Sequence, residues 1–338
     1  MKFGILGSGS WGTALAKILT DNGQSIYWWN RSDNAIKQIL TRRHNPHYLS
    51  GAYFNVDQLI LTTDPTEVIQ NSDCIIIAIP SAYVETTLKK LDKNILTGKK
   101  IISAVKGILP EQSILLNDFL KNEFGFAIEN YFTVLGPCHA EEVAAEKLSY
   151  LTFSGTDEST TLNITKYFKT DYLNTIENND IYGVQYAAVL KNIYAVGAGM
   201  AHGLEYGDNF LSVFIANCAN EMAGFLKMAD VKNIEYRDTN NCNKNYATSV
   251  YLGDLLVTCY SLFSRNRTFG NMIGKGYSVK SAQIEMSMVA EGYYASKGIH
   301  TINQKIMAEM PIAETVYQIL WKGLSASEGF NIIEPTLI

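Results

Sequence analysis

A glycine-rich hexapeptide near the start of the chain restricts the possible folds more than any other feature. Gly7-Ser8-Gly9-Ser10-Trp11-Gly12 follows an apolar run, Lys2–Leu6, and precedes a stretch of helical composition, Thr13–Leu19. The pattern G-x-G-x-x-G between a strand and a helix opens a βαβ unit, where the glycines permit a tight turn and a close approach of a pyrophosphate to the backbone. It therefore predicts a dinucleotide-binding domain, with Gly7, Gly9 and Gly12 in the phosphate-binding turn.

Further β-type runs alternate with helical stretches through the first half of the sequence. The clearest are Ser25–Trp29, Asp73–Ile79, Lys100–Val105 and Tyr131–Leu135, with shorter runs at Ser149–Phe153 and Leu173–Ile176. Strands that are apolar almost throughout are typical of a parallel sheet buried on both faces. We therefore expect a Rossmann-type, doubly wound α/β domain over residues 1–181.

The second half has a different pattern, because strand signals become sparse after residue 182 and apolar residues recur at helical spacing. The expected helices are Tyr186–Met200, Asn209–Met228, Gly253–Phe263, Lys280–Lys297 and Ile312–Trp321. These predict an all-α C-terminal domain over residues 182–338. The polar, turn-rich segment Asn233–Asn245 is interpreted as an exposed connection between helices.

Composition excludes several classes of protein. The net charge of −5 does not provide the broad basic surface of a nucleic-acid-binding protein, so we expect no nucleic-acid partner. No apolar run reaches the roughly 18 residues of a membrane span, so no membrane insertion is expected. The five cysteines form no Cys-x-x-Cys pair, which argues against a disulfide scaffold and a zinc site. We expect no metal and a reducing, cytoplasmic compartment.

The end of the second predicted strand bears on the choice of cofactor. NAD-specific domains usually carry Asp or Glu there, whereas this chain has Asn30-Arg31-Ser32. Arg31 can bind a 2′-phosphate, although it can equally be a solvated surface arginine. Because arginine can also stack on adenine, the sequence predicts use of NADPH/NADP and of NADH/NAD, with NADPH favoured.

Lys191 is the strongest candidate for a catalytic residue. It lies in the otherwise apolar run Ala187–Ile193. A dehydrogenase that oxidises an alcohol needs a proton acceptor, and a lysine can serve when burial or neighbouring cations lower its pKa. A lone lysine in an apolar helix can instead extend to solvent, and this run alone leaves both interpretations open.

Several sequence blocks, in order, carry a family resemblance. They are GSGSWGTALA from Gly7, SAVKG from Ser103, GPCHAEEVA from Gly136, VLKNIYAVGAG from Val189, GDN from Gly207, LGDLLVTC from Leu252, SRNRTFG from Ser264, VAEGY from Val289 and MPIAETVYQIL from Met310. With these blocks the chain resembles the bacterial NAD(P)-dependent glycerol-3-phosphate dehydrogenases over almost its whole length. The resemblance implies a Rossmann domain followed by a helical domain, and interconversion of dihydroxyacetone phosphate and sn-glycerol 3-phosphate for phospholipid synthesis.

The resemblance also implies roles for individual residues, with Lys191 as the proton acceptor and Ser264-Arg265-Asn266 as a phosphate clamp. The substrate contacts it implies are Lys106, Gly136, Cys138, Lys191, Asp254, Ser264, Arg265 and Asn266. Together with the glycine-rich turn, the expected cofactor contacts are Gly7, Gly9, Ser10, Trp11, Gly12, Arg31, Lys106, Ala140, Arg265, Val289 and Glu291. Asp254 has a second interpretation as a helix N-cap.

The chain departs from the family pattern at Cys138, where a hydroxyl side chain is usual, and at Asn217, which replaces an arginine. We expect a phosphorylated small-molecule substrate and a homodimer. Two alternatives stay open: a related two-domain reductase of another small hydroxy or keto acid, and a dinucleotide-sensing protein without turnover.

Overall fold

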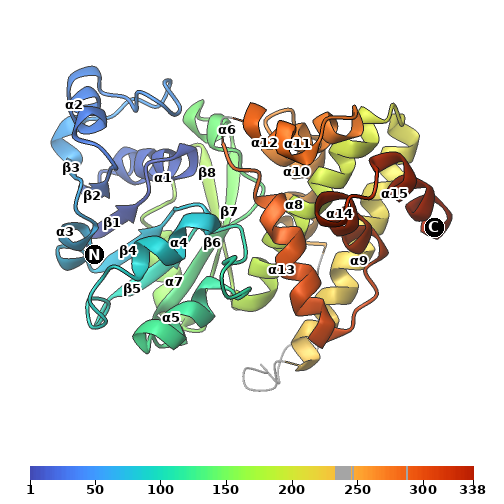
Figure 1. The fold of residues 1–338 in the computed structure, drawn as a ribbon. Helices are drawn as coiled ribbons and strands as arrows, with labels where there is room; N and C mark the ends of the chain where they lie inside the picture. The colour runs from blue at the N-terminus through green and yellow to red at the C-terminus, as the bar shows by residue number, and fades with distance from the viewer. Residues whose placement is uncertain (233–244, 246, 287) are drawn as a thin grey trace. The chain divides into compact units, whose positions relative to one another are not determined.

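The computed structural model describes residues 1–232, 245, 247–286 and 288–338 (Figure 1). Its contacts divide the chain into two units, the first made of Met1–Val105 and Leu115–Ile181 and the second of Lys106–Ile114 and Tyr182–Ile338. The sequence placed Lys106–Ile114 in the first domain, but it joins the second unit, where Ile108 packs against Gly298 so closely that an added Cβ would lie 2.9 Å from it. The connection expected at Asn233–Asn245, and Cys242 within it, fall outside the described residues except for Asn245.

The first unit is built on an eight-stranded sheet with the order β3-β2-β1-β4-β5-β6-β7-β8. The strands are β1 (Phe3–Leu6), β2 (Ile26–Trp29), β3 (Leu59–Thr62), β4 (Cys74–Ile77), β5 (Lys100–Ser103), β6 (Tyr131–Leu135), β7 (Ser149–Ser154) and β8 (Leu173–Asn178). Neighbouring strands from β3 to β6 run parallel, and the order of these six is that of a Rossmann domain. The sheet departs from a purely parallel one at the antiparallel β6–β7 pair.

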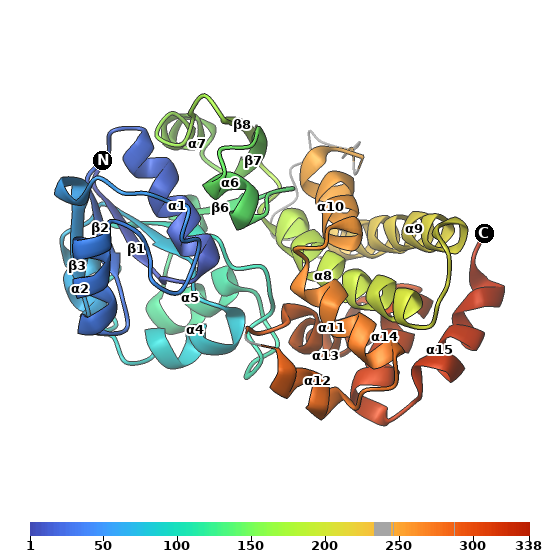
Figure 2. The same ribbon diagram turned by 90° about the horizontal axis from the view of Figure 1, so that it is seen from above.

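Helices cover both faces of this sheet, and in Figure 2 α1 and α7 lie on one face while α4 and α5 lie on the other. The helices of the unit are α1 (Ser10–Asp21), α2 (Asp33–Arg42), α3 (Pro65–Gln70), α4 (Ser81–Leu88), α5 (Leu116–Phe124), α6 (Ala140–Ala144) and α7 (Glu158–Thr165). Every residue of β1, β4 and β6 is buried. The sequence did not indicate β3, because this edge strand pairs only with β2 and buries only Leu59.

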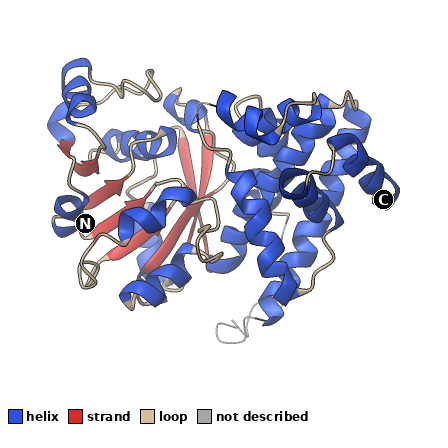
Figure 3. Ribbon diagram, viewed as in Figure 1, coloured by secondary structure: helices blue, strands red, loops and turns tan. Residues whose placement is uncertain are grey.

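The second unit contains helices in place of a sheet, as the colouring in Figure 3 shows. They are α8 (Ile181–Gly203), α9 (Asp208–Lys232), α10 (Asp254–Tyr260), α11 (Arg265–Gly274), α12 (Val279–Glu285), α13 (Glu291–Ile306), α14 (Pro311–Lys322) and α15 (Ala326–Ile333). The expected fold class, a Rossmann-type α/β domain followed by an all-α domain, is thereby confirmed. Among the described residues, no helix combines the length and apolar character that crossing a membrane requires.

Close packing of α8 against α11 determines which residues can meet in this unit. A Cβ added at Gly199 would collide with the carbonyl oxygen of Arg267, and one added at Gly270 would collide with that of Val196. The two helix backbones therefore touch without intervening side chains, which only glycine permits. This contact brings the start of α11 beside the middle of α8, where Lys191 and Asn192 lie.

Two helical predictions need correction in this unit. The stretch expected over Lys280–Lys297 is broken between α12 and α13, because Gly292 N donates a hydrogen bond to Asn266 Oδ1 at 2.9 Å and α13 begins there instead. Asp254 is the first residue of α10 and the N-cap is Gly253, so the side chain of Asp254 does not cap the helix.

Candidate active site

The glycine-rich turn between β1 and α1 has the geometry of an anion-binding loop. Gly7 has φ +125°, a conformation that side chains rarely adopt, and a Cβ there would lie 2.5 Å from the carbonyl oxygen of Ala78. A Cβ at Gly12 would collide with the carbonyl oxygen of Gly7, so this glycine keeps α1 close to the strand. Gly9 is the N-cap of α1 and makes no side-chain cap hydrogen bond, and a Cβ there would meet nothing within 4 Å.

This geometry fits a dinucleotide cofactor. The space beside Gly9 is open, and no side chain caps the start of the 12-residue helix α1, whose first N–H groups have no acceptor within a helix. Backbone N–H groups and the helix dipole attract phosphate at such a place. Of the other predicted cofactor residues here, Ser10 is buried at the start of α1, Trp11 packs against the core and Arg31 is exposed between β2 and α2.

A second turn follows β6, at the same carboxyl edge of the sheet. Gly136 has φ +137°, and a Cβ there would lie 2.9 Å from the carbonyl oxygen of Tyr150. The thiol of Cys138 is 6% exposed and donates a hydrogen bond to that same carbonyl oxygen at 3.0 Å. This hydrogen bond links the turn to β7. The buried residue Ala140, two positions after Cys138, begins α6.

A buried ion pair lies at the centre of the second unit. Lys191 Nζ on α8 pairs with Asp254 Oδ1 on α10, and the two side chains are 3% and 2% exposed. Asp254 Oδ2 is buried as well, and no hydrogen-bond donor reaches it from the described part of the chain. Burial raises the pKa of the neighbouring Cys259 thiol to about 12, against the influence of Lys191, so this thiol stays neutral at neutral pH.

An unpaired buried carboxylate oxygen is costly unless a donor satisfies it. A substrate hydroxyl placed beside Lys191 would supply that donor. The pair therefore offers one group that can exchange a proton and one oxygen that can orient a hydroxyl.

A chain of amide hydrogen bonds next to the ion pair joins four segments of this unit. Asn192 Nδ2 donates to the carbonyl oxygen of Lys106 at 2.8 Å, and Asn266 Nδ2 donates to Asn192 Oδ1 at 2.8 Å. Asn266 Oδ1 in turn accepts from Gly292 N, directly after Glu291. Sequence analysis assigned no role to Asn192, which is 4% exposed. Its only signal was a second polar residue directly after Lys191 in an apolar run.

The remaining predicted residues of the second unit lie around this network. Ser264 is the buried N-cap of α11 and accepts a hydrogen bond from Arg267 N at 3.3 Å. Arg265 is exposed, and its Nη1 lies 3.6 Å from Met288 Sδ. Val289 and Glu291 are half-buried, and Glu291 is the first residue of α13. The structure thus gathers Lys106, Lys191, Asp254, Asn266 and Glu291 through direct contacts or adjacent residues.

Comparison with known proteins places these features in a family. Residues 2–161 match the model of the NAD-dependent glycerol-3-phosphate dehydrogenase N-terminus, and residues 180–331 match that of the C-terminus. The chain is 33% identical to a glycerol-3-phosphate dehydrogenase (NAD(P)+) of Bacillus velezensis over 324 residues, which are 95% of this chain and 90% of that protein. It is also 33% identical to the enzyme of that name from Listeria monocytogenes, over 98% of this chain and 95% of the other.

A solved structure agrees with these matches. The glycerol-3-phosphate dehydrogenase of Coxiella burnetii superposes with a TM-score of 0.86 at 26% identity, covering 99% of this chain and 98% of that one. Both halves of the sequence and the fold as a whole therefore agree, and the chain belongs to the NAD-dependent glycerol-3-phosphate dehydrogenase family.

Proposed function

We propose that this protein catalyses the NAD(P)H-dependent interconversion of dihydroxyacetone phosphate and sn-glycerol 3-phosphate. The observation that carries the proposal is the buried pair of Lys191 and Asp254, with a carboxylate oxygen that has no donor among the described residues. A buried ammonium beside a carboxylate can donate a proton to a carbonyl oxygen during reduction, and the resulting amine can accept it during oxidation.

Each residue then has a separate task. When bound, the reduced nicotinamide supplies a hydride to the carbonyl carbon. Lys191 Nζ donates the proton that the carbonyl oxygen needs as it becomes a hydroxyl. Asp254 holds Lys191 in place through Oδ1, while Oδ2 accepts a hydrogen bond from a substrate hydroxyl.

Phosphate recognition is assigned to the start of α11. The guanidinium of Arg265 is exposed and suits a bidentate contact with phosphate oxygens. Its neighbour Asn266 uses one of its two Nδ2 hydrogens on Asn192. Ser264 accepts a bond from Arg267 N, and its hydroxyl group also has a proton that it can donate. We propose that these three residues bind the phosphate of the substrate, and that Lys106, Gly136 and Cys138 are further substrate contacts.

For the cofactor, we propose that Gly7, Gly9, Ser10, Trp11 and Gly12 bind the pyrophosphate and adjoining groups. Arg31 would bind the 2′-phosphate of NADPH, and its exposure leaves it accessible for that role. The other proposed cofactor contacts are Ala140, Lys106, Arg265, Val289 and Glu291. Both NADPH and NADH are expected to serve.

The proposal extends to the cell. The product sn-glycerol 3-phosphate is the backbone of glycerophospholipids, so the enzyme would supply their synthesis. The four described cysteines form no disulfide with one another, which supports a reducing, cytoplasmic location. We also propose a homodimer, supported by the apolar side chains of Leu262 and Phe263, which are 85% and 54% exposed. Light scattering with chromatography would test it, and a monomer at all concentrations would contradict it.

One assay separates this function from its alternatives. Purified protein is mixed with NADPH and, in parallel, dihydroxyacetone phosphate, unphosphorylated keto acids or no substrate, and oxidation is followed by absorbance. The proposal expects rapid oxidation with dihydroxyacetone phosphate alone. Faster oxidation with a keto acid would indicate a different reductase, and cofactor binding without substrate-dependent oxidation would indicate a sensing protein.

A further inference from the structure

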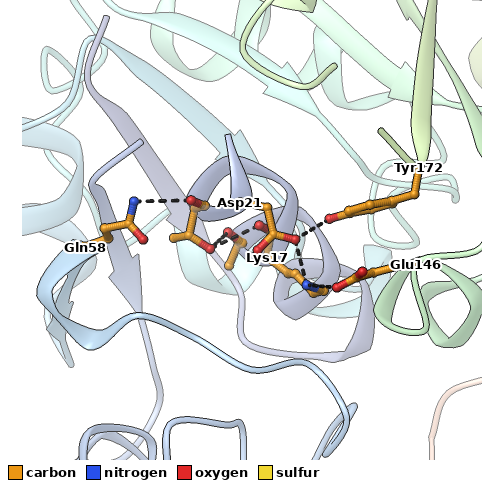
Figure 4. A network of polar contacts seen from close by, with 7 residues as sticks. Lys17, Asp21, Gln58, Glu146 and Tyr172 are labelled. Atoms are coloured by element: carbon orange, nitrogen blue, oxygen red, sulfur yellow. Dashed lines mark hydrogen bonds and ion pairs between the residues drawn. The ribbon is translucent and has the colours of Figure 1, made fainter. Parts of the chain in front are cut away.

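A second buried lysine lies in the first unit, away from the residues assigned above (Figure 4). Lys17 on α1 has a side chain only 6% exposed, and its Nζ donates to Asp21 Oδ2 at 2.6 Å and to Glu146 Oε1 at 2.9 Å. The hydroxyl of Tyr172, directly before β8, also donates to Asp21 Oδ2 at 2.6 Å. The network thus joins α1, the end of α6 and the start of β8.

The backbone at Glu146 adopts a conformation that residues with side chains rarely take. Glu146 follows α6 with φ 54°, in the left-handed region that glycine occupies without steric cost. Any other residue there carries a cost of roughly 1–2 kcal/mol. From this position the Glu146 carboxylate, on a side chain that is 61% exposed, contacts the buried Nζ of Lys17.

The short helix α6 brings few apolar side chains to its interface with α1. The two helices pack against each other, but α6 presents only Ala140, Val143 and Ala144 to the core. Few apolar side chains of α6 are therefore available to hold this helix against α1. The Lys17–Glu146 ion pair fixes the far end of α6 to α1 with a charge-assisted hydrogen bond.

Both helices begin at residues to which we have assigned cofactor contacts, the glycine-rich turn for α1 and Ala140 for α6. α1 begins at the glycine-rich turn, and α6 begins directly after the Gly136–Cys138 turn. We propose that Lys17 is a positioning residue, which holds α6 against α1 through Glu146 and thereby sets the spacing of the glycine-rich turn and Ala140 for cofactor binding. This inference rests on the proposed function, since that function assigns the cofactor to the glycine-rich turn and to Ala140.

The charge of Lys17 persists through the physiological pH range. Burial by itself lowers the pKa of Lys17, but its hydrogen bonds to Asp21 and Glu146 outweigh burial and raise the pKa above 10.5. A raised lysine pKa means that the stabilising contribution is present at lower pH and is lost only as pH rises through the folded-state value. The effect of Lys17 on cofactor binding is therefore expected to be constant between pH 6 and 9.

The decisive experiment measures the Kd for NADPH by fluorescence titration, which does not require turnover. Lys17→Met removes the cation, and Glu146→Gly removes the carboxylate while relieving the left-handed strain. Both variants are expected to weaken NADPH binding about tenfold or more, because small displacements of binding groups have large effects. Glu146→Gly should keep the melting temperature of the wild type, so lost binding would not reflect lost folding. Lys17→Arg should bind NADPH like the wild type.

A matched control comes from another lysine–glutamate pair of the same unit, Lys93 Nζ with Glu123 Oε2 at 2.6 Å. Lys93→Met should leave the Kd unchanged. The inference is overturned if folded Glu146→Gly and Lys17→Met bind NADPH as tightly as the wild type, or if Lys93→Met weakens binding equally. If Lys17→Met does not fold, Glu146→Gly decides alone. Failure of the wild type itself to bind NADPH and NADH would instead refute the proposed function.

Discussion

The two units build their candidate sites from different parts of the chain. In the first unit, the backbone forms the site: Gly7 and Gly136 take conformations that side chains rarely adopt, and Gly9 leaves open space at a helix end. In the second, buried side chains form it, with Lys191 and Asp254 less than 4% exposed. Adding atoms should therefore damage the first site, whereas removing functional groups should damage the second.

The largest effect is expected where one buried side chain carries the chemistry. Lys191→Met removes the proton donor, and loss of a general acid or base typically costs about 10²–10⁴ in kcat. NADPH binding in the first unit should persist, as fluorescence titration would show. Because the substitution also leaves Asp254 buried without a partner, Lys191→Met/Asp254→Asn serves as a second variant. Turnover close to that of the wild type in either folded variant would exclude Lys191 as the proton donor.

The exposed arginine of the second unit should show a smaller and more selective effect. Arg265→Ala removes a charge-assisted hydrogen bond to phosphate, worth about 1.5–3 kcal/mol or roughly 10–150-fold. We expect that loss in kcat/KM for dihydroxyacetone phosphate and little change for dihydroxyacetone, which lacks the phosphate. Lys275→Ala, at the other end of α11, is a control that should affect neither substrate. Equal losses on both substrates would contradict a phosphate-specific role.

In the first unit, two glycines of one turn should respond differently to the same added methyl group. Gly9→Ala has open space, so it should fold normally but weaken NADPH binding by about 1–3 kcal/mol, through overlap with the bound pyrophosphate. Gly12→Ala collides with the backbone of Gly7, so it should also lower the melting temperature without cofactor. Thermal unfolding and NADPH titration of both variants test the contrast. Wild-type affinity in Gly9→Ala would place the pyrophosphate elsewhere.

One side chain of the first unit is expected to influence the preference for NADPH over NADH. Arg31→Asp replaces an attractive charge by a repulsive one and should reduce kcat/KM with NADPH about tenfold, or roughly 1.4 kcal/mol. The value with NADH should change less, because NADH lacks the 2′-phosphate. Arg42→Asp, at the other end of α2, controls for the overall change in charge. A strong wild-type preference for NADH, or equal losses with both cofactors, would show that Arg31 does not bind the 2′-phosphate.

The sequence predicted best what depends on local pattern. β1, β4 and β6 were predictable because every residue in them is buried, which produces unbroken apolar runs. The edge strand β3 was not, because it buries a single side chain. The break before α13 was missed because the start of this helix depends on a distant residue, Asn266, whose Oδ1 accepts a hydrogen bond from Gly292 N.

In the candidate site, too, residues in a recognisable local pattern were predictable and residues whose role depends on distant partners were not. The glycine-rich turn follows from its own six residues, and Lys191 is visible as a charge in an apolar run. Asn192 was not assigned, because its role depends on Lys106 and Asn266, which reach it only through the packing of the second unit. The role of Glu146 is equally non-local, since its partner Lys17 lies on another helix.

A last prediction concerns Glu221 on α9, a second buried carboxyl group of the helical unit. It accepts hydrogen bonds from Ile312 N at 2.8 Å and Ala313 N at 2.9 Å, at the start of α14, and from the hydroxyl of Tyr194 at 3.0 Å. Burial outweighs these bonds and raises the pKa of Glu221 from 4.5 to about 7. The folded state therefore binds more protons than the unfolded state between these values, and stability falls as pH rises through that window.

Glu221→Gln cannot ionise, so it should remove this part of the pH dependence. Between pH 5 and 8, the unfolding free energy of the wild type should fall by about 2–3 kcal/mol more than that of the variant, a few degrees in melting temperature. Glu328→Gln is a control that should change the pH dependence of stability in the opposite direction, because hydrogen bonds from Ser325 lower the pKa of Glu328. Its stabilising contribution is present at neutral pH and is lost on acidification. Identical pH profiles for the wild type and Glu221→Gln would mean that Glu221 does not titrate in this range, and that its hydrogen bonds join the middle of α9 to the start of α14 equally firmly at every pH tested.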